Sequence, residues 1–465
     1  MKYLIISTLF LLISTSLQAQ NDWVGTWEGD LNIGAQELRI VFHLKKGDDN
    51  TWTALMDSPD QMAYDLKMDE VTIKNDKEIN MSLKAAQAKF VGTLSEDKQS
   101  IQGNWIQGMS FPLELKRSKA KGIARPQEPK APFPYTIEKV KYENKKAKIN
   151  LAGTLTIPEG EGKHPVVILI SGSGPQDRDE SILKHKPFWI LADYWTRNGF
   201  AVLRFDDRGV GESEGDHSKA TSADFATDVE AGVLFLKKHD RINAKKIGLA
   251  GHSEGGMIAP IVASKNKDVA FIVLLAGPGV AGNELMLKQG YDIMKQQGIE
   301  EEQLVITQKI SKKIYDAVIK DTKEELGVGD IVKLVKEDAE KLDDETRKEI
   351  GLDEASLRQS ITTLQSPWMR YFIRYQPKKY LQKVKCPVLA INGEKDLQVA
   401  AKPNLEAIKA ALATAKNKNV KIVSLPNLNH LFQTAETGAV EEYVKIEETF
   451  SPKAMQLVLD WMKKQ

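Results

Sequence analysis

The most constraining feature of the sequence is the stretch 246–257, KIGLAGHSEGGM, in which Ser253 lies between Gly251 and Gly255. An aliphatic run that predicts a buried strand, residues 247–250, leads directly into this Gly-x-Ser-x-Gly pattern, and a helix-forming segment follows. A turn sharp enough to lift the Ser253 hydroxyl clear of a sheet leaves no room for side chains beside it, which explains both glycines. Strand, turn and helix in this order are what a nucleophilic serine requires. Because a five-residue pattern recurs by chance, the surrounding sequence has to show whether Ser253 is a nucleophile.

The first twenty residues differ in composition from the rest of the chain. Lys2 precedes an apolar and hydroxyl run, residues 3–17, and Ala19 is a small residue suited to signal peptidase. The run is shorter than the roughly 20 residues of a membrane-spanning helix, and no cysteine follows it to carry a lipid. We therefore expect residues 1–20 to be a cleavable signal peptide, and the protein to be secreted or periplasmic without stable membrane insertion.

Residues 21–119 show hydrophobic alternation with a period of two, for example at 38–45, separated by turn-forming segments. This pattern predicts a small all-β domain, a barrel or sandwich of about eight strands. Its tryptophans are expected in the core, or alternatively on an exposed platform for a glycan; they are Trp23, Trp27, Trp52 and Trp105. Residues 120–134 contain four prolines without periodicity, which indicates a semi-rigid linker.

From residue 135 to residue 465, strand patterns alternate with helical patterns, which predicts a mainly parallel sheet covered on both faces. The alternation is interrupted at about 282–383, where only helical segments are found. About a hundred helical residues between two sheet strands must lie outside the sheet. We expect them to form a lid over its carboxyl edge.

Charge and composition exclude several classes of function. The chain has 65 Lys and Arg against 64 Asp and Glu, a formal net charge of +1, so it offers no basic excess for nucleic acid. Cys386 is the only cysteine, so no intrachain disulfide can form. Neither a phosphate-binding glycine loop nor a metal-ligand spacing is present, and we expect no cofactor and no metal. The sequence does not indicate an oligomeric state.

Two loops downstream supply partners for Ser253. In a parallel sheet the strand ends deliver their loops to one edge, where ligands bind. Asp396 follows the apolar run 388–391, and His430 follows the run 420–425. Serine, acid and histidine in this chain order are typical of the α/β-hydrolase fold. A serine hydroxyl needs a base to take its proton, and the imidazole needs a carboxylate to orient it, so Ser253, Asp396 and His430 are the candidate catalytic residues.

Some positions of this site have competitors. Glu394 lies in the same loop as Asp396, which we favour because Gly393 and Asp396 have the spacing of the Gly-x-x-Asp acid loop of this fold. The oxyanion of the reaction needs two N–H donors. The Glu254 N–H is the first, and the Ser173 N–H, with Gly174 as its alternative, is the second.

Five stretches carry a resemblance to a known family. They are SGSGPQDRDE from Ser171, FDDRGVGES from Phe205, GHSEGG from Gly251, SPWMRYFIRY from Ser366 and NGEKDLQV from Asn392. On these stretches, residues 135–465 resemble a bacterial serine esterase of the α/β-hydrolase superfamily, in the branch near dienelactone hydrolases and prolyl-oligopeptidase-type peptidases. Lipase-type relatives carry a His-Gly-Gly-Gly loop where this chain has residues 171–174. The turn 206–209, Asp-Asp-Arg-Gly, is interpreted as an Arg–carboxylate brace or as a substrate contact.

These observations predict a secreted carboxylic-ester hydrolase that works through an acyl-enzyme on a small-molecule ester. The lid should set substrate preference through apolar side chains, the candidates being Trp368, Met369, Tyr371 and Phe372. A serine peptidase or a thioesterase with the same three residues is the alternative. A binding protein with a glycan- or lipid-binding β-domain and an inert hydrolase domain is the alternative from another class.

Overall fold

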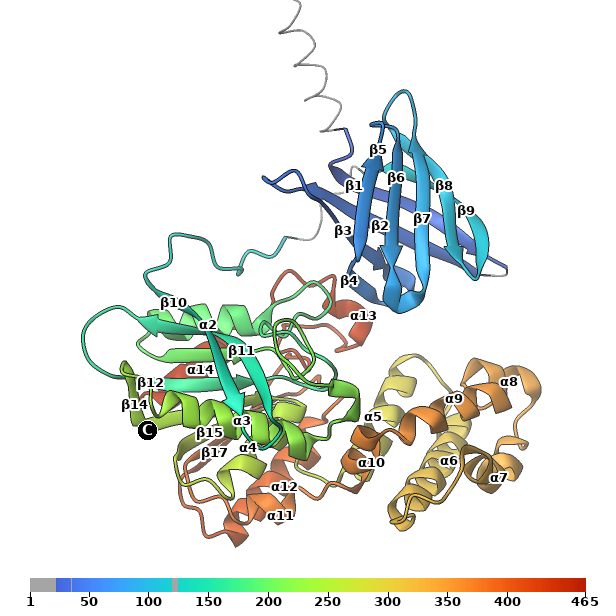
Figure 1. The fold of residues 1–465 in the computed structure, drawn as a ribbon. Coiled ribbons are helices and arrows are strands. Elements are labelled where there is room, and N and C mark those ends of the chain that lie inside the picture. The colour runs from blue at the N-terminus through green and yellow to red at the C-terminus, as the bar shows by residue number, and fades with distance from the viewer. Residues whose placement is uncertain (1–21, 35, 119–123) are drawn as a thin grey trace, which may run out of the picture. The chain divides into compact units, whose positions relative to one another are not determined.

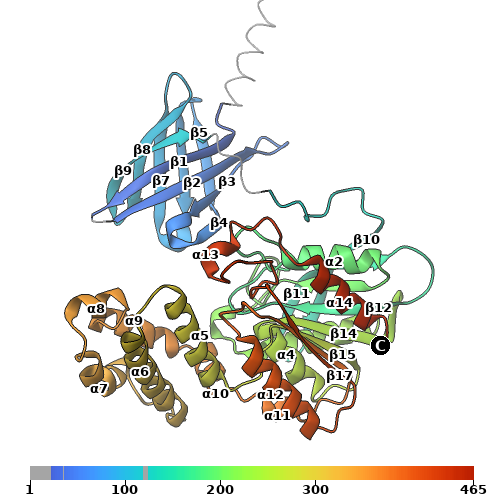
Figure 2. The ribbon, with the colours of Figure 1, turned by 180° about the vertical axis from the view of Figure 1, so that it is seen from behind.

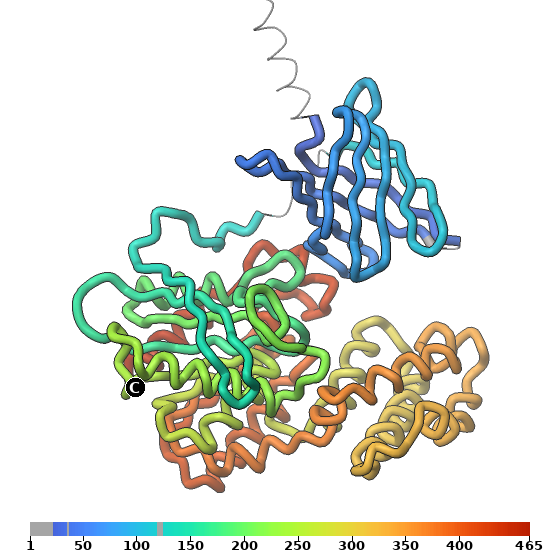
Figure 3. The backbone as a smooth tube through the Cα atoms, in the orientation of Figure 1, coloured from blue at the N-terminus to red at the C-terminus, as the bar shows by residue number. Residues whose placement is uncertain are grey.

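The computed structural model describes residues 22–34, 36–118 and 124–465. The predicted signal peptide lies outside these residues. The chain divides into two compact units, one reaching to residue 124 together with residues 182–184, and one formed by residues 125–181 and 185–465 (Figures 1 and 3). The division at residue 124 falls inside the predicted linker.

The first unit is one antiparallel sheet of nine described strands, which curls into a half-barrel (Figure 1). The strand order is β4-β3-β2-β1-β9-β8-β7-β6-β5. Strands that follow one another in sequence pair with each other, except β4 and β5, which are the two edges, and β1 also pairs with β9. The strands are β1 (Gly25–Ile33), β2 (Gln36–Lys46), β3 (Trp52–Ser58), β4 (Ala63–Lys67), β5 (Glu70–Lys74), β6 (Glu78–Leu83), β7 (Ala88–Leu94), β8 (Ser100–Gln107) and β9 (Met109–Arg117), with short 3₁₀ turns at Pro59–Gln61 and Lys84–Ala86. The sequence led us to expect about eight strands, and a sandwich of two sheets was an open alternative to the single curled sheet.

The alternation of the sequence places one side chain in two inside this curled sheet. Trp23, Trp27 and Trp105 are buried in its core, next to Phe42 and Phe90. These three tryptophans therefore have the core positions expected of them, and they are not available as an exposed platform. Trp52 is half-buried at the start of β3.

The second unit contains an eight-stranded sheet in the order β10-β11-β13-β12-β14-β15-β16-β17. The first two strand pairings are antiparallel and the others are parallel, as predicted from the alternation of strands and helices. The strands are β10 (Tyr135–Asn144), β11 (Ile149–Pro158), β12 (His164–Ile170), β13 (Ala201–Phe205), β14 (Ile242–His252), β15 (Val269–Leu275), β16 (Val388–Gly393) and β17 (Val420–Leu425).

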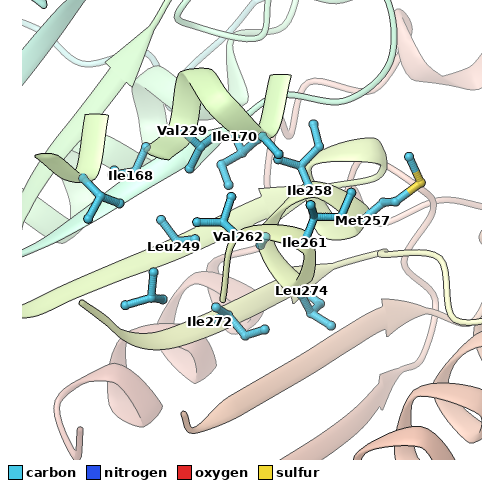
Figure 4. Close-up of a cluster of buried hydrophobic side chains, with 14 of the residues drawn as sticks. Ile168, Ile170, Val229, Leu249, Met257, Ile258, Ile261, Val262, Ile272 and Leu274 are labelled. Carbon is cyan, nitrogen blue, oxygen red and sulfur yellow. The ribbon is translucent and has the colours of Figure 1, made fainter. Parts of the chain in front are cut away.

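Helices cover both faces of this sheet, which explains why central strands such as β12, β15 and β16 are almost continuously apolar. Val167 and Leu169 of β12 face a core beneath α2 and α14, whereas Ile168 and Ile170 face a core beneath α3 and α4 (Figure 4). Figure 2 shows α2 and α14 side by side on the first face. The covering helices are α2 (Pro187–Arg197), α3 (Ser222–Leu236), α4 (Glu254–Ala263), α12 (Ala401–Thr414) and α14 (Pro452–Met462); α13 (Val440–Tyr443) and a 3₁₀ turn at His217–Lys219 lie in connections.

Seven helices occupy the segment between β15 and β16 that was predicted as a lid. They are α5 (Gly282–Gln296), α6 (Glu301–Lys320), α7 (Val328–Ala339), α8 (Asp344–Glu349), α9 (Glu354–Leu364), α10 (Pro367–Arg374) and α11 (Lys378–Leu381). Helices α6, α7 and α9 pack around an apolar cluster of their own, which includes Val318, Val335 and Ile361. Together with the parallel sheet, this insertion confirms the predicted α/β-hydrolase fold. Among the described residues, no helix is both long and apolar enough to cross a bilayer.

Candidate active site

Ser253 forms the turn between β14 and α4, with φ 51° and ψ −114°. A Cβ atom added to Gly251 would lie 2.0 Å from the carbonyl oxygen of Gly255, and one added to Gly255 would lie 2.1 Å from that of Ile170. Both distances are far shorter than a van der Waals contact, so only glycine fits on either side of the serine. A non-glycine residue at positive φ costs on the order of 1–3 kcal/mol, which the surrounding structure must hold in place.

Asp396 and His430 meet at the same edge of the sheet, at the ends of the neighbouring strands β16 and β17. His430 Nδ1 lies 2.8 Å from Asp396 Oδ2. The two side chains are 5% and 0% exposed, so water does not compete for this hydrogen bond. The structure thus brings together the base and the acid that were predicted from their places after these strands.

Asp396 is fixed by donors from its own loop. Its Oδ1 accepts hydrogen bonds from the backbone N–H groups of Gln398 and Val399, both at 2.8 Å, and Asn392 Nδ2 donates to its Oδ2 at 3.2 Å. The competing acid, Glu394, is exposed and accepts a hydrogen bond from the Ser424 hydroxyl at 3.1 Å. Of the two carboxylates, Asp396 is therefore the one that orients His430.

Ser253 lies near His430 because the preceding residue, His252, contacts His430. The His252 ring centroid lies 4.8 Å from the His430 ring centroid, and His252 Nε2 donates to the His430 carbonyl oxygen at 3.0 Å. In the described part of the chain, the Ser253 hydroxyl has no hydrogen-bond partner. The bond between a catalytic serine and its base is often long in a free enzyme and shortens when substrate binds.

Two backbone N–H groups are available beside Ser253. Glu254 is the first residue of α4, where an N–H has no acceptor within the helix. The Ser173 N–H, in the loop after β12, donates to no acceptor among the residues described, whereas the Gly172 N–H is bonded to a carboxylate at 2.7 Å. Ser173, Ser253 and Glu254 line one cavity, and Gly174 is not among its lining residues.

This cavity has a volume of about 220 Å³ and is lined in part by the inserted helices α5 and α10. Helix α10 contributes Trp368, Met369 and Phe372, which are three of the four predicted substrate-binding residues. The remaining lining residues are Pro278, Leu285, Met286, Gln289, Gln398 and Val399. The wall thus combines apolar side chains with two neutral amides, two serines and Glu254.

Tyr371 is found on the other side of α10. It lines a second cavity of about 360 Å³ together with Tyr375 and Tyr380, and its hydroxyl lies 3.4 Å from that of Tyr380. Successive residues of a helix point about 100° apart, so the four residues predicted from α10 cannot all share one face. A role of Tyr371 in binding substrate stays a prediction.

Glu254 contributes a side chain that sequence analysis did not consider. Its carboxyl group is buried and accepts hydrogen bonds at Oε1 from the Ser222 hydroxyl and, at 2.8 Å, from the Trp368 indole N–H. Burial raises the pKa of Glu254 to about 7, although both hydrogen bonds act to lower it. This carboxyl group links the first turn of α4 to the wall of the cavity.

The Asp-Asp-Arg-Gly turn after β13 is a brace. Asp206 accepts hydrogen bonds from the Arg178 side chain, and the Arg208 guanidinium forms an ion pair with buried Asp228 at 2.8 Å. Asp207 accepts two hydrogen bonds from the loop after β12, and burial raises its pKa to about 8. These contacts hold the loop that carries Ser173 against the end of the sheet.

Two further polar residues lie beside the site. Neither His252 nor Glu180 was among the candidate site residues from the sequence. In the structure His252 Nδ1 lies 2.9 Å from Glu180 Oε1, with side chains 8% and 3% exposed. The only available signal was that Glu180 ends the stretch SGSGPQDRDE. Within the described ranges 22–34, 36–118 and 124–465, no group of three or more His, Cys, Asp or Glu side chains could hold a metal ion.

Comparison with known proteins gives matches in the second unit. A family described as serine aminopeptidase, S33, matches residues 187–436, which is more than half of the chain. Esterase EstD of Thermotoga maritima is 29% identical over 318 residues, which cover 67% of this chain and 66% of that esterase. An uncharacterized 31.7 kDa protein of Escherichia coli, from the traX-finO intergenic region, is 25% identical over 257 residues, covering 55% of this chain and 81% of that protein.

Solved structures are similar at lower identity. The α/β-hydrolase GrgF from Penicillium sp. sh18 has a TM-score of 0.45 and 16% identity, covering 71% of this chain and 98% of that one. The Pyrococcus furiosus esterase Pf2001 has a TM-score of 0.43 and 17% identity, covering 75% of this chain and 99% of that one.

Proposed function

The chain belongs to the α/β-hydrolase family described as serine aminopeptidase, S33, and we propose that within this family of serine hydrolases it is a secreted carboxylesterase. The observation that carries the proposal is the hydrogen bond between His430 Nδ1 and Asp396 Oδ2 at the sheet edge where the Ser253 turn also ends. A buried carboxylate on one ring nitrogen fixes the tautomer and leaves Nε2 to act as the base. Resemblance to an esterase over two thirds of the chain supports the same reaction.

The proposed reaction proceeds through an acyl-enzyme. Ser253 Oγ attacks the ester carbonyl carbon while His430 takes the hydroxyl proton, and the resulting oxyanion accepts hydrogen bonds from the N–H groups of Glu254 and Ser173. The bond between the carbonyl carbon and the alkoxy oxygen then breaks, and His430 returns its proton to the departing alcohol. A water molecule, deprotonated by His430, releases the carboxylic acid in a second round. Each oxyanion donor contributes roughly 10²–10³-fold to such a reaction.

The lining of the cavity favours esters over peptides with a free amino terminus. An amino-terminal ammonium needs carboxylates to bind it, and among the described lining residues Glu254 alone is acidic. Its Oε1 is already occupied by Ser222 and Trp368. A cavity of about 220 Å³ whose wall is apolar along α10 suits a short or medium acyl group. The family description keeps an aminopeptidase as the second candidate, and aminoacyl p-nitroanilides compared with p-nitrophenyl esters distinguish the two.

Replacing the nucleophile tests the proposal. Ser253→Ala should lower the hydrolysis of p-nitrophenyl butyrate by about 10⁴-fold or more, because no other group can form the acyl-enzyme. A fluorophosphonate probe should label the unaltered protein at Ser253, as mapped by peptide mass spectrometry. Ser264→Ala, at the far end of α4, is the matched control and should keep full activity. Unchanged turnover in Ser253→Ala would refute the proposal.

Export is the second part of the proposal. Residues 1–20 have the charge and apolar pattern of a signal peptide, so the mature chain should begin near residue 20 or 21. Amino-terminal sequencing of protein recovered from the periplasm or the medium tests this. An intact Met1 in the exported fraction would contradict it.

A further inference from the structure

The pair His252–Glu180 lies directly beside the proposed nucleophile and has no part in the proposed reaction. His252 Nε2 donates to the His430 carbonyl oxygen at 3.0 Å, and His252 Nδ1 lies 2.9 Å from Glu180 Oε1. Both side chains are almost completely buried. Buried ionisable groups are costly unless they are paired, so a pair at this place requires a reason.

The hydrogen bonds define where the protons are. A carbonyl oxygen can only accept, so His252 Nε2 carries a hydrogen. Glu180 Oε1 also accepts the Gly172 N–H at 2.7 Å. An ionised carboxylate can only accept, so with Glu180 as a carboxylate the Nδ1 of His252 carries a hydrogen as well, and the ring is the imidazolium. In this protonation state the two residues form a buried ion pair.

The surrounding charges agree with this protonation. Burial acts to lower the pKa of His252, but the charge and hydrogen bond of Glu180, the carbonyl of His430 and the charge of Asp396 outweigh it, and the pKa is raised. Glu180 faces the ring from the loop after β12, and Asp396 and His430 face it from the loops after β16 and β17.

The ion pair connects three segments whose relative positions matter for the proposed reaction: the loop after β12, the Ser253 turn and the loop after β17. Glu180 holds the Gly172 N–H, which immediately precedes Ser173, the proposed oxyanion donor. A Cβ atom added to Gly172 would lie 3.4 Å from Ser253 Cβ and 3.5 Å from His252 Nδ1, so this loop already contacts the nucleophile turn. On its other side His252 holds the backbone of His430.

We propose that His252 and Glu180 are positioning residues, whose ion pair fixes the oxyanion loop and the backbone of the base against the nucleophile turn. The inference rests on the proposed roles of Ser253, Ser173 and His430. It predicts an effect on the rate of the chemical step rather than on substrate binding, because neither side chain is among the residues that line the cavity. Outer hydrogen-bond partners of this kind are worth about 10- to 100-fold, and a misplacement of about 1 Å costs about 100-fold.

The experiment separates the two hydrogen bonds of the ring. In His252→Asn the amide can replace Nδ1 and keep the bond to Glu180, and in His252→Gln it can replace Nε2 and keep the bond to the His430 carbonyl. Each variant should lower kcat for p-nitrophenyl butyrate by about 10- to 100-fold with KM within about threefold, and should weaken a trifluoromethyl ketone inhibitor by a similar factor. A purely structural role would not produce this split between kcat and KM.

Glu180→Gln removes the charge and keeps the shape. Without Glu180⁻, the pKa of His252 should fall, because burial is no longer opposed. The ratio of the kcat of the variant to that of the unaltered enzyme should then decrease as pH rises, since the neutral ring loses one of its two donors. Titrations that affect both proteins equally cancel in this ratio of kcat values. A ratio that does not change with pH would overturn the proposal.

Matched controls come from a second His–Glu pair. His239 Nε2 lies 3.1 Å from Glu138 Oε2, with side chains 17% and 35% exposed, and neither residue lines the candidate site. His239→Gln and Glu138→Gln should keep kcat, KM and inhibitor binding. If His252→Asn, His252→Gln and Glu180→Gln behave like these controls while Ser253→Ala is inactive, the positioning role is refuted and the proposed function stands. Activity in Ser253→Ala would refute the proposed function instead.

A measurement on the unaltered protein covers variants that fail to fold. With ¹³C,¹⁵N-labelled histidine, the His252 ring should keep the NMR shifts of an imidazolium to a higher pH than free histidine does, because its pKa is raised, and both ring N–H protons should be protected from exchange. Loss of the imidazolium shifts at or below the pH at which free histidine loses them would overturn the proposal.

Discussion

The carboxyl edge of the parallel sheet and the helices inserted above it build the candidate site by different means. At the sheet edge, Asp396 is held by two backbone N–H groups and an amide, and its partner His430 is held through its own carbonyl. In the insertion, all of whose residues are described, α6, α7 and α9 pack mainly on one another, and only α5 and α10 reach the cavity. Their contribution to it is mostly apolar contact.

The difference implies that the sheet edge and the inserted helices have separate roles. The candidate reacting residues are held by hydrogen bonds, several of them from the backbone, and we expect a displacement there to lower the rate. The shape of the cavity depends on side chains of the inserted helices, and we expect a change of volume there to alter the preference among substrates. The carboxyl group of Glu254 and the indole of Trp368 form a contact between the two regions.

The largest expected effect lies on the sheet edge. Asp396→Asn should lower kcat by about 10⁴-fold, because an amide no longer fixes the tautomer of His430 or stabilises its charged form. Hydrolysis of p-nitrophenyl butyrate measures the effect. Glu394→Gln, in the same loop but exposed and bonded to Ser424, should change kcat less than about twofold. If the two variants lose equal activity, the assignment of the acid is wrong.

The contact between the two regions should be visible in stability. The pKa of Glu254 rises from 4.5 in the unfolded chain to about 7 in the native state, so the native state binds the extra proton between these values. Glu254 therefore stabilises most below about pH 4.5, and this contribution is lost as pH rises to about 7. Glu254→Gln does not titrate, so its stability relative to the unaltered protein should increase by about 3 kcal/mol between pH 4.5 and pH 8.

Thermal or urea unfolding of both proteins at the two pH values measures this difference. Asp207 titrates in both proteins with a pKa raised to about 8, but the charge of Glu254 contributes to that shift, so Asp207 does not cancel completely. A stability difference that does not change with pH would mean that the pKa of Glu254 is the same in the native and unfolded states.

The smallest effect is expected in the insertion. Trp368→Ala enlarges the cavity and removes the ring that stacks on Phe372 at 5.2 Å. It should shift the ratio of kcat/KM for decanoate over butyrate esters by about tenfold toward decanoate, the value of a one- or two-methylene difference in an apolar pocket. Leu334→Ala, an exposed apolar residue of α7, is the control and should leave the ratio unchanged. An unchanged ratio in Trp368→Ala would show that α10 does not select the acyl chain.

The sheet, the insertion and the candidate reacting groups could be predicted because each depends on short-range pattern. Continuous apolar runs mark strands buried on both faces, and Ser253 and Asp396 follow such runs, whereas His430 follows the mixed run 420–425 at the edge of the sheet. Gly251 and Gly255 could be explained from the amino-acid sequence alone, since the geometry of the turn requires them.

The remaining features depend on contacts between distant segments. Glu180 lies 72 residues before His252, in a loop whose path is fixed by the brace after β13, so no local pattern connects the two. Four neighbouring residues of α10 seemed equivalent in sequence, yet the orientation of the helix directs Tyr371 away from the other three. In the first unit, the alternation that predicted about eight strands could not decide between a sandwich and one curled sheet, because that choice is made by the pairing of β1 with β9.

Helix α10 separates two cavities. Trp368, Met369 and Phe372 border a volume of about 220 Å³, and Tyr371 with Arg374 borders one of about 360 Å³. A single eight-residue helix cannot move toward one of these volumes without withdrawing from the other. A ligand that displaces α10 away from Ser253 would therefore narrow the cavity lined by Tyr371, Tyr375 and Tyr380 on the other side of the helix.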